Sequence, residues 1–362
     1  MPRSLREKRT PLYAGGVLLL TLVSLFSLYQ VLPTLHRSIS AHAAAAPLMV
    51  SANGMTYTCV PQPTITPPPT PKGAHAIPEN YPKLCSNGQV PQPNANHTPR
   101  RGYVPGTPAY NQAVHATSSA TKPMTTCPQN GTAYYCYVSL TESVSDVGVD
   151  SSMGQPNPYL KSTDYHSLTE IVAEDNSADI VGMGNNVDNN LNGDLHTHLF
   201  IESFINGVQQ GWNGGNGYVQ YSSTLTPGMQ VTASSVNTYF YEIEYSAGNW
   251  WVYYNTGWVG YYPGSSWTSP TFTSTSLGSW YGEVAASTAS PCSDMGNGNF
   301  GSNGSATRPL LVAGTVSGTH TFANTPSDTN SSWYDNSTAS TGGTTEQFYY
   351  GGPGSGGVIK GC

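Results

Sequence analysis

Hydrophobic and polar residues alternate along several short stretches in the second half of the chain. The alternation is clearest at residues 217–221, 239–245 and 250–254. A period of two places successive side chains on opposite faces of a β-strand. Turn-forming sequences separate these stretches, for example at 226–228 (Thr-Pro-Gly) and at 247–249 (Ala-Gly-Asn). The pattern therefore predicts an antiparallel all-β domain, built as a sandwich or a barrel.

The same pattern places one hairpin. Residues 168–174 and 180–186 are expected to form two strands that are joined by a turn at 175–177 (Asp-Asn-Ser). Turn signals recur closely throughout residues 131–362. We therefore expect no helix longer than about three turns in that part of the chain.

The first 46 residues have the character of an export signal. Four basic residues among the first nine precede an uncharged apolar run at 12–32, and small residues (Ala-His-Ala-Ala-Ala-Ala) follow at 41–46. This order is typical of a signal peptide. A run of 21 residues is also long enough to cross a bilayer as a helix. The sequence thus predicts an N-terminal export helix, which is either cleaved or kept as a membrane anchor through residues 12–32. The rest of the chain would be extracellular or on the outer face of the cell membrane.

Proline divides the remaining chain into two parts. Sixteen of the 28 prolines lie between residues 47 and 128, including three in a row at 67–69. Such a composition favours an extended linker or a pro-segment, here residues 47–130. Residues 131–362 would then form the single folded domain.

This domain is strongly acidic. Residues 131–362 contain three basic and 18 acidic side chains, a formal charge of −15. Nucleic acid is excluded as a partner, because phosphate binding needs a basic patch. Crowded carboxylates repel one another at neutral pH, so an acidic habitat would suit the domain. A negative surface that only keeps an exported protein soluble explains the charge equally well.

The six cysteines all follow the export segment and are even in number. Disulfides persist outside the cytoplasm, so three bonds are expected. The simplest connectivity joins neighbours along the chain: Cys59 with Cys85, Cys127 with Cys136, and Cys292 with Cys362.

Several motifs follow one another in the domain. They are Asn-Trp-Trp-Val at 249–252, Trp-Val-Gly-Tyr-Tyr-Pro at 258–263, Trp-Tyr-Gly-Glu-Val at 280–284 and Met-Gly-Asn-Gly-Asn-Phe at 295–300. In this order they resemble the neprosin family, which has a Trp pair, a Gly-Tyr-Trp-Pro turn, a Gly-Gly-Glu-Val strand and a Met-Gly-Ser-Gly-His-Phe loop. Residues 164–171 (Asp-Tyr-His-Ser-Leu-Thr-Glu-Ile) resemble the segment that opens the family's catalytic domain.

The resemblance implies a two-sheet β-sandwich that hydrolyses peptide bonds after proline at acid pH, using two glutamates and no cofactor. Two close carboxyl groups cannot both ionise easily, so one can act as an acid while the other acts as a base. Glu283 aligns with the second of these glutamates.

The first family glutamate is missing, because Gly182 occupies its position and Asn185 occupies that of a following Trp. Glu202 stands in an otherwise apolar stretch nearby, and carboxylates seldom occur there without a reason. Glu202 is therefore the candidate replacement, with a solvent-facing strand position as the alternative. Glu170 and Glu174 are read as ordinary residues near the hairpin.

Other polar and aromatic residues are candidates for metal binding or substrate binding. Asp194, His196 and His198 could present three ligands on one face of a strand. They lack a further ligand, so no metal site is predicted. Glu242 and Glu244 alternate with aromatic residues and are expected on a solvated face. The candidate substrate-binding residues are four aromatics, which would otherwise pack in the core: Trp250, Trp251, Tyr261 and Trp280.

Two functions follow from these observations. The first is an exported glutamic endopeptidase that acts on a proline-containing protein or peptide through Glu283 and Glu202. The second is a catalytically silent β-sandwich that binds peptide or cell-surface glycan through its aromatic residues. The motif around Glu283 favours the first, and Gly182 favours the second.

Overall fold

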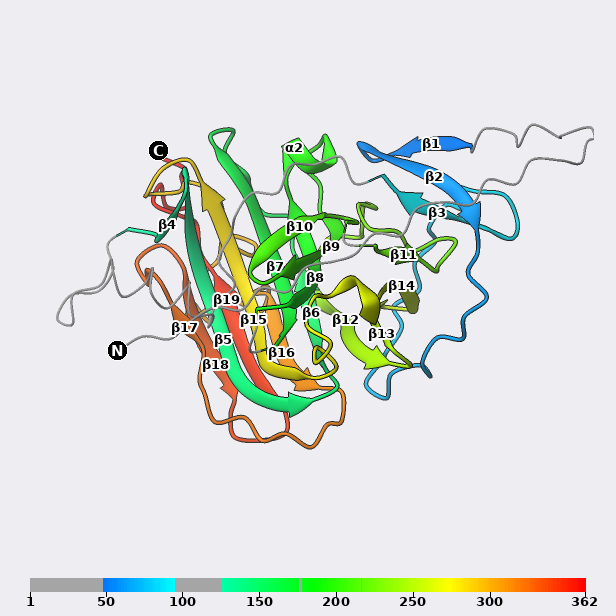
Figure 1. Ribbon diagram of the computed structural model, residues 1–362. Helices are drawn as coiled ribbons and strands as arrows, with labels where there is room; N and C mark the ends of the chain where they lie inside the picture. The colour runs from blue at the N-terminus through cyan, green and yellow to red at the C-terminus, as the bar shows by residue number, and fades with distance from the viewer. Residues whose placement is uncertain (1–47, 95–125, 176–177, 216) are drawn as a thin grey trace, which may run out of the picture. The chain divides into compact units, whose positions relative to one another are not determined.

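The computed structural model describes residues 48–94, 126–175, 178–215 and 217–362 (Figure 1). Within these residues the only helices are α2, Asn189–Asn192, and the 3-10 turn η1, Gly264–Ser266. The expectation of an all-β domain without a long helix is confirmed for this part of the chain. No helix among the described residues is long and apolar enough to cross a membrane. The predicted export helix at 12–32 lies outside them.

The first of two large sheets contains eight antiparallel strands in the order β10-β9-β8-β7-β15-β5-β17, with β4 paired to β5 (Figure 1). Its members are β4 Gln129–Asn130, β5 Ala133–Asp146, β7 Asp164–Glu174, β8 Ile180–Val187, β9 His198–Ile205, β10 Val208–Trp212, β15 Thr275–Ala286 and β17 Ser327–Asp328. The second sheet is also antiparallel, in the order β11-β14-β13-β12-β6-β16-β19-β18. It consists of β6 Gly148–Gln155, β11 Val219–Gln220, β12 Ser234–Ser246, β13 Asn249–Tyr254, β14 Gly257–Pro263, β16 Leu310–Thr315, β18 Asp335–Ser340 and β19 Glu346–Gly351.

The hairpin predicted from alternation is present. Leu168 pairs with Asn186 and Glu174 pairs with Ile180, so β7 and β8 meet in the expected register. The turn between β12 and β13 also forms where the sequence indicates it. Ala247 and Gly248 both have positive φ, at 49° and 81°, as a tight hairpin turn of this kind requires.

The main hydrophobic core lies between the two large sheets. One face of every long strand contributes to it, which is why alternate residues are apolar. Two tryptophans deep in this core have their ring N–H groups satisfied. Trp250 donates to the carbonyl oxygen of Phe272 at 3.0 Å, and Trp280 donates to that of Asp150 at 2.8 Å. Buried polar groups of this kind need such partners, so these bonds fix the orientation of the rings.

The proline-rich segment, expected to be a linker, contains three strands: β1 Met49–Ala52, β2 Met55–Pro61 and β3 Gln89–Pro93. They form a separate antiparallel sheet. Tyr57 of β2 donates to the carbonyl oxygen of Pro227 at 2.9 Å, and Gln92 of β3 donates to that of Tyr218 at 2.8 Å. These two hydrogen bonds connect the small sheet to the rest of the domain. The sequence of β3, Gln-Val-Pro-Gln-Pro, shows no alternation of apolar and polar residues.

Residues 62–82, between β2 and β3, form a proline-rich strap over the outer face of the second sheet. An aromatic cluster covers that face, and it consists of Phe240, Trp251, Tyr253, Trp258 and Tyr261. Ile65 and Ala74 of the strap pack against this cluster. Trp258 donates its ring N–H to the carbonyl oxygen of Pro68 at 3.0 Å, and Asn255 exchanges two hydrogen bonds with the backbone of Ile77. The strap thus keeps these aromatic rings out of water.

All three expected disulfides are present: Cys59 with Cys85, Cys127 with Cys136, and Cys292 with Cys362. The Cys59–Cys85 bond joins the two chain segments that flank the strap. A cross-link of this kind lowers the entropy of the unfolded chain and so favours the folded state.

We expect Trp258→Phe to lower the free energy of unfolding more than loss of ring volume alone, by about 1 kcal/mol for the hydrogen bond to Pro68. Trp251→Phe is the matched control, because Trp251 lies in the same cluster and its ring N–H has no partner. Urea unfolding of both variants measures the difference. Equal or smaller destabilisation by Trp258→Phe would contradict the role given to this bond.

Candidate functional site: a cluster of buried carboxyl groups

Three glutamates stand on the face of the first sheet that is turned away from the second sheet. Glu283 of β15 pairs with Leu168 of β7, which is two residues from Glu170. Glu170 in turn pairs with Gly184 of β8. Two residues away on β8, Gly182 pairs with Glu202 of β9. Paired residues in antiparallel strands project from the same face, so the three carboxyl groups share one side of the sheet. They are buried, with exposed fractions of 1% to 4%.

Apolar side chains surround the three carboxyl groups on this face. They form a second hydrophobic cluster, which includes Leu168, Val172, Phe200, Trp212 and Tyr281. Such a setting disfavours charge, because a buried ion loses its hydration. The hydrogen bonds and ion pairs of the glutamates therefore decide their protonation.

Glu283 is paired with a histidine. The ring Nε2 of His166, on β7, lies 2.6 Å from Glu283 Oε1, and its Nδ1 lies 3.8 Å from Asp188 Oδ2. Burial alone would lower the pKa of His166, but the contacts with Asp188 and Glu283 outweigh it and raise the pKa to about 9. His166 is therefore a cation at neutral and acid pH, and it donates its Nε2 proton to a carboxylate at Glu283.

Glu170 and Glu202 form a carboxyl pair beside Gly182. Each group accepts a hydrogen bond from a neighbour. Tyr281 donates its hydroxyl to Glu170 Oε2 at 2.5 Å, and Gln209 of β10 donates its amide to Glu202 Oε2. Two buried carboxyl groups so close together cannot both ionise easily, so the pair favours the binding of a proton.

Both members of the pair bind protons more tightly than an exposed glutamate. Burial raises the pKa of Glu170 well above its ordinary value, and the negative charge of Glu202 is the next largest cause of this shift. Burial also raises the pKa of Glu202 to about 7, although hydrogen bonds from Glu170 and Gln209 oppose the shift. The negative charge of Glu283 raises both pKa values further. Below pH 7 the pair is thus mainly uncharged.

Gly182 makes room for the pair. A Cβ atom at this position would lie 2.1 Å from Glu170 Oε1 and 3.1 Å from Glu202 Cγ. The carboxyl group of Glu170 thus occupies the space over β8 into which a side chain at position 182 would project. Any larger residue there would have to displace it.

The structure places Glu202 on the same face as Glu283, as the replacement hypothesis requires. The catalytic role of the two residues stays a prediction. Sequence reasoning missed Glu170, His166 and Gln209. The signal for Glu170 was available, since it is an even-numbered residue of β7 like Leu168 and so shares its face.

The four aromatic residues predicted to bind substrate are all buried. Trp250 and Trp280 belong to the core between the sheets, and Trp280 points to the opposite side of β15 from Glu283. Trp251 and Tyr261 lie in the aromatic cluster beneath the strap. A substrate-binding role for these four residues stays a prediction, and their burial gives it no support.

The remaining polar candidates have structural partners. His198 bonds to Asp194 and to the carbonyl oxygen of Gly228, each at 2.9 Å. No group of three or more metal-binding side chains occurs among the described residues. The expected solvated face is wrong for Glu242, which is 3% exposed because it lies within the second sheet between Asp150 and Tyr253.

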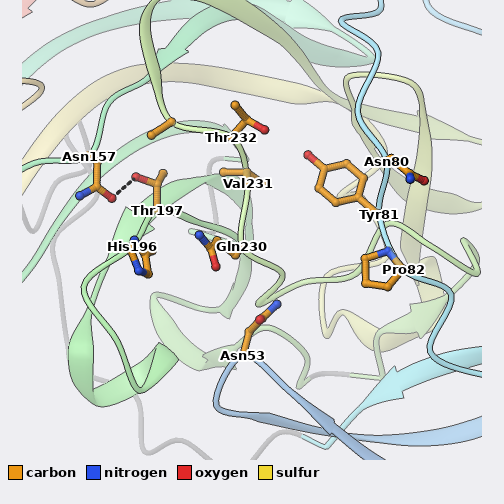
Figure 2. A pocket seen from close by; sticks show the side chains of 11 residues that line it. Asn53, Asn80, Tyr81, Pro82, Asn157, His196, Thr197, Gln230, Val231 and Thr232 are labelled. Carbon is orange, nitrogen blue, oxygen red and sulfur yellow. Dashed lines mark hydrogen bonds between the residues drawn. The ribbon is translucent and has the colours of Figure 1, made fainter.

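A separate hollow lies near the end of the strap. It is a cavity of about 450 Å³, lined mainly by neutral polar side chains (Figure 2). Tyr81 and Pro82 line one side and Val231 and Thr232 another, as Figure 2 shows. None of the three glutamates lines this pocket.

Comparison with known proteins agrees with this architecture. The family model described as Neprosin matches residues 163–353, more than half of the chain. The chain belongs to the neprosin family. No curated protein sequence matches it.

Several solved structures are similar in part. One is scytalido-glutamic peptidase with a peptide-based transition state analog, at 10% identity and a TM-score of 0.29, covering 60% of this chain and 97% of that one. Another is SCP-B, a member of the eqolisin family of peptidases, in complex with the tripeptide Ala-Ile-His, at 8% identity and a TM-score of 0.28, with the same coverage. A third is carbohydrate-binding module CBM66 from Bacillus subtilis, at 14% identity and a TM-score of 0.22, covering 44% and 80%. At these TM-scores none of the likenesses bears on the activity of this chain.

The free energy of unfolding should fall as pH rises from about 4 to about 9. Burial raises the folded-state pKa of Asp150 and Glu202 to about 7, of Glu174 to about 8 and of Glu242 to about 9, above the ordinary carboxyl pKa of about 4. The folded protein then binds more protons than the unfolded chain across this range. Each such group stabilises the fold fully below its unfolded pKa and ceases to do so as pH passes its folded pKa, with a slope of about 1.4 kcal/mol per pH unit in between.

Urea unfolding over this pH range measures the slope. Glu174→Gln is the control, because it should remove one group's share of the slope between its two pKa values. A stability that rises between about pH 5 and pH 8 would contradict the expectation.

Proposed function

We propose that the protein is an exported endopeptidase that hydrolyses peptide bonds in proline-containing proteins or peptides at acid pH. The observation that carries the proposal is the meeting of Glu283, Glu202 and Glu170 on one buried face in a member of the neprosin family. The family resemblance supplies the preference for proline.

The chemistry needs a base and an acid on opposite sides of the scissile carbonyl. Glu283 is the base, since His166 holds it as a carboxylate. It takes a proton from water while the water oxygen bonds to the carbonyl carbon. The protonated pair that contains Glu202 donates a proton to the carbonyl oxygen. When the carbon–nitrogen bond breaks, Glu283 returns its proton to the amine and the pair recovers its own.

Acid conditions suit this division of roles. The pair donates a proton only while it holds enough of them, and burial raises the pKa of Glu202 to about 7. Above that pH, Glu202 becomes a second buried carboxylate beside Glu283. Cleavage should therefore decline as pH rises through about 7.

Several features support export. Three disulfides join all six cysteines, a number that is typical of proteins outside the cytoplasm. The basic start and apolar run of the first 46 residues fit either a cleaved signal or an anchor through residues 12–32. In both cases the catalytic face would meet extracellular substrate.

Glu283→Gln should lower peptide cleavage by a factor of about 100 or more, because an amide cannot accept the proton of water. The assay uses the full chain and a proline-containing peptide at acid pH, before and after limited proteolysis, since the carboxyl groups are buried. Mass spectrometry of the products identifies the cleaved bond.

Glu174→Gln is the control for this assay. Glu174 is also a buried glutamate of β7, but it is absent from the carboxyl pair and from the contacts of His166. The variant should keep its activity. Full activity of Glu283→Gln, or no cleavage by the unmodified chain, would refute the proposed reaction.

The second candidate is ligand binding without catalysis, and the cavity of about 450 Å³ favours it. Its amide and hydroxyl groups can hydrogen-bond a neutral polar ligand such as a glycan (Figure 2). A thermal shift of the Glu283→Gln variant separates the two functions. The peptidase proposal expects stabilisation by a proline-rich peptide, whereas stabilisation by polysaccharide alone would favour glycan binding.

A further inference from the structure

Gly182 stands where the neprosin family has a glutamate, and Glu170 on the neighbouring strand β7 brings a carboxyl group to the same place. Glu170 reaches across from β7, and its Oε1 lies 2.1 Å from where a Cβ of residue 182 would be. Glycine is the one residue that leaves this space open. The loss of a side chain at position 182 and the placement of Glu170 are therefore two parts of one arrangement.

Glu170 is held there by specific contacts. Tyr281 donates its hydroxyl to Oε2 at 2.5 Å. Glu170 is 1% exposed, and a buried carboxyl group is unfavourable without such a partner. Three ionisable neighbours act on it: Glu202 from β9, and Glu283 and Tyr281 from β15. His166, on the same strand as Glu170, contacts Glu283.

We propose that Glu170 is the second catalytic carboxyl group of this protein and acts as the acid opposite Glu283. Glu202 is then a positioning residue, which holds Glu170 over Gly182 and sets how readily it releases its proton. This inference rests on the proposed peptidase function and assigns the acid within it.

Position separates the two glutamates. Glu170 brings a carboxyl oxygen, Oε1, to within 2.1 Å of where a Cβ of residue 182 would lie, whereas the nearest atom of Glu202 is its Cγ, at 3.1 Å. When Glu202 ionises, its charge holds the proton of Glu170 more tightly, so Glu170 becomes a weaker acid. The decline of activity with pH would thus be set by Glu202 even though Glu170 gives the proton.

Replacement of each glutamate tests these roles. Glu170→Gln should lose as much activity as Glu283→Gln, a factor of about 100 or more. Glu202→Gln should lose less and should remain active at higher pH than the unmodified chain, because its amide keeps the shape of the side chain but cannot ionise beside Glu170. Glu174→Gln, from the same strand, should behave as the unmodified chain.

Substitution of Gly182 tests whether the open space at this position is needed to hold the carboxyl group of Glu170. Gly182→Ala should displace the carboxyl group of Glu170 and lose activity with it, although it changes no ionisable group. Gly257→Ala is the matched control, since a Cβ there would make only an ordinary contact, 3.5 Å from Leu225. The double variant Glu170→Gly with Gly182→Glu moves the carboxyl group to β8 and should cleave at least about tenfold faster than Glu170→Gly alone.

The outcomes separate this inference from the function on which it rests. An unmodified chain that cleaves no peptide refutes both. An active chain that is unaffected by Glu170→Gln, or a double variant no faster than Glu170→Gly, refutes the role of Glu170 and leaves the peptidase in place. A greater loss in Glu202→Gln than in Glu170→Gln would assign the acid to Glu202.

Discussion

An excess of buried carboxyl groups governs this structure. Glu170, Glu202 and Glu283 share one apolar face, and among the described residues His166 alone forms an ion pair with this group, at Glu283. One positive charge can compensate one carboxylate, so the other two groups keep protons or repel each other. The fold, its stability and its proposed chemistry all depend on where those protons reside. An acidic medium supplies them without cost to the folded state.

The sheet converts this constraint into an ordered site. Strands β15, β7, β8 and β9 are neighbours, and each carries either a carboxyl group or the glycine that accommodates one. Register decides which groups meet, and a shift of one residue would turn a glutamate into the core between the sheets. The long ladder between β15 and β7 therefore fixes Glu283 and Glu170 more firmly than their own side-chain contacts could.

Much of the fold could be predicted from short-range patterns. Alternation identified β12 and β13, and neighbouring cysteines pair as expected. The hairpin of β7 and β8 was predicted, although β7 begins four residues before the predicted start at 168. The small sheet was missed because the many prolines around it favoured a linker, although residues 55–59 of β2 do alternate between buried and half-buried positions. For the site, motif order identified Glu283, and Glu202 was noticed as a charge among apolar residues. Glu170 was missed because its role depends on a neighbour that has no side chain.

The place of β15 in the sheet has a consequence for how the chain reaches its folded state. This strand, residues 275–286, inserts between β5 and β7, which precede it by more than 100 residues. During synthesis, the edges of β5 and β7 thus remain unpaired until β15 has been made. Such long-range pairing is slow, and unpaired edges invite association with other chains. Mutual repulsion among acidic nascent chains would oppose that association during the delay.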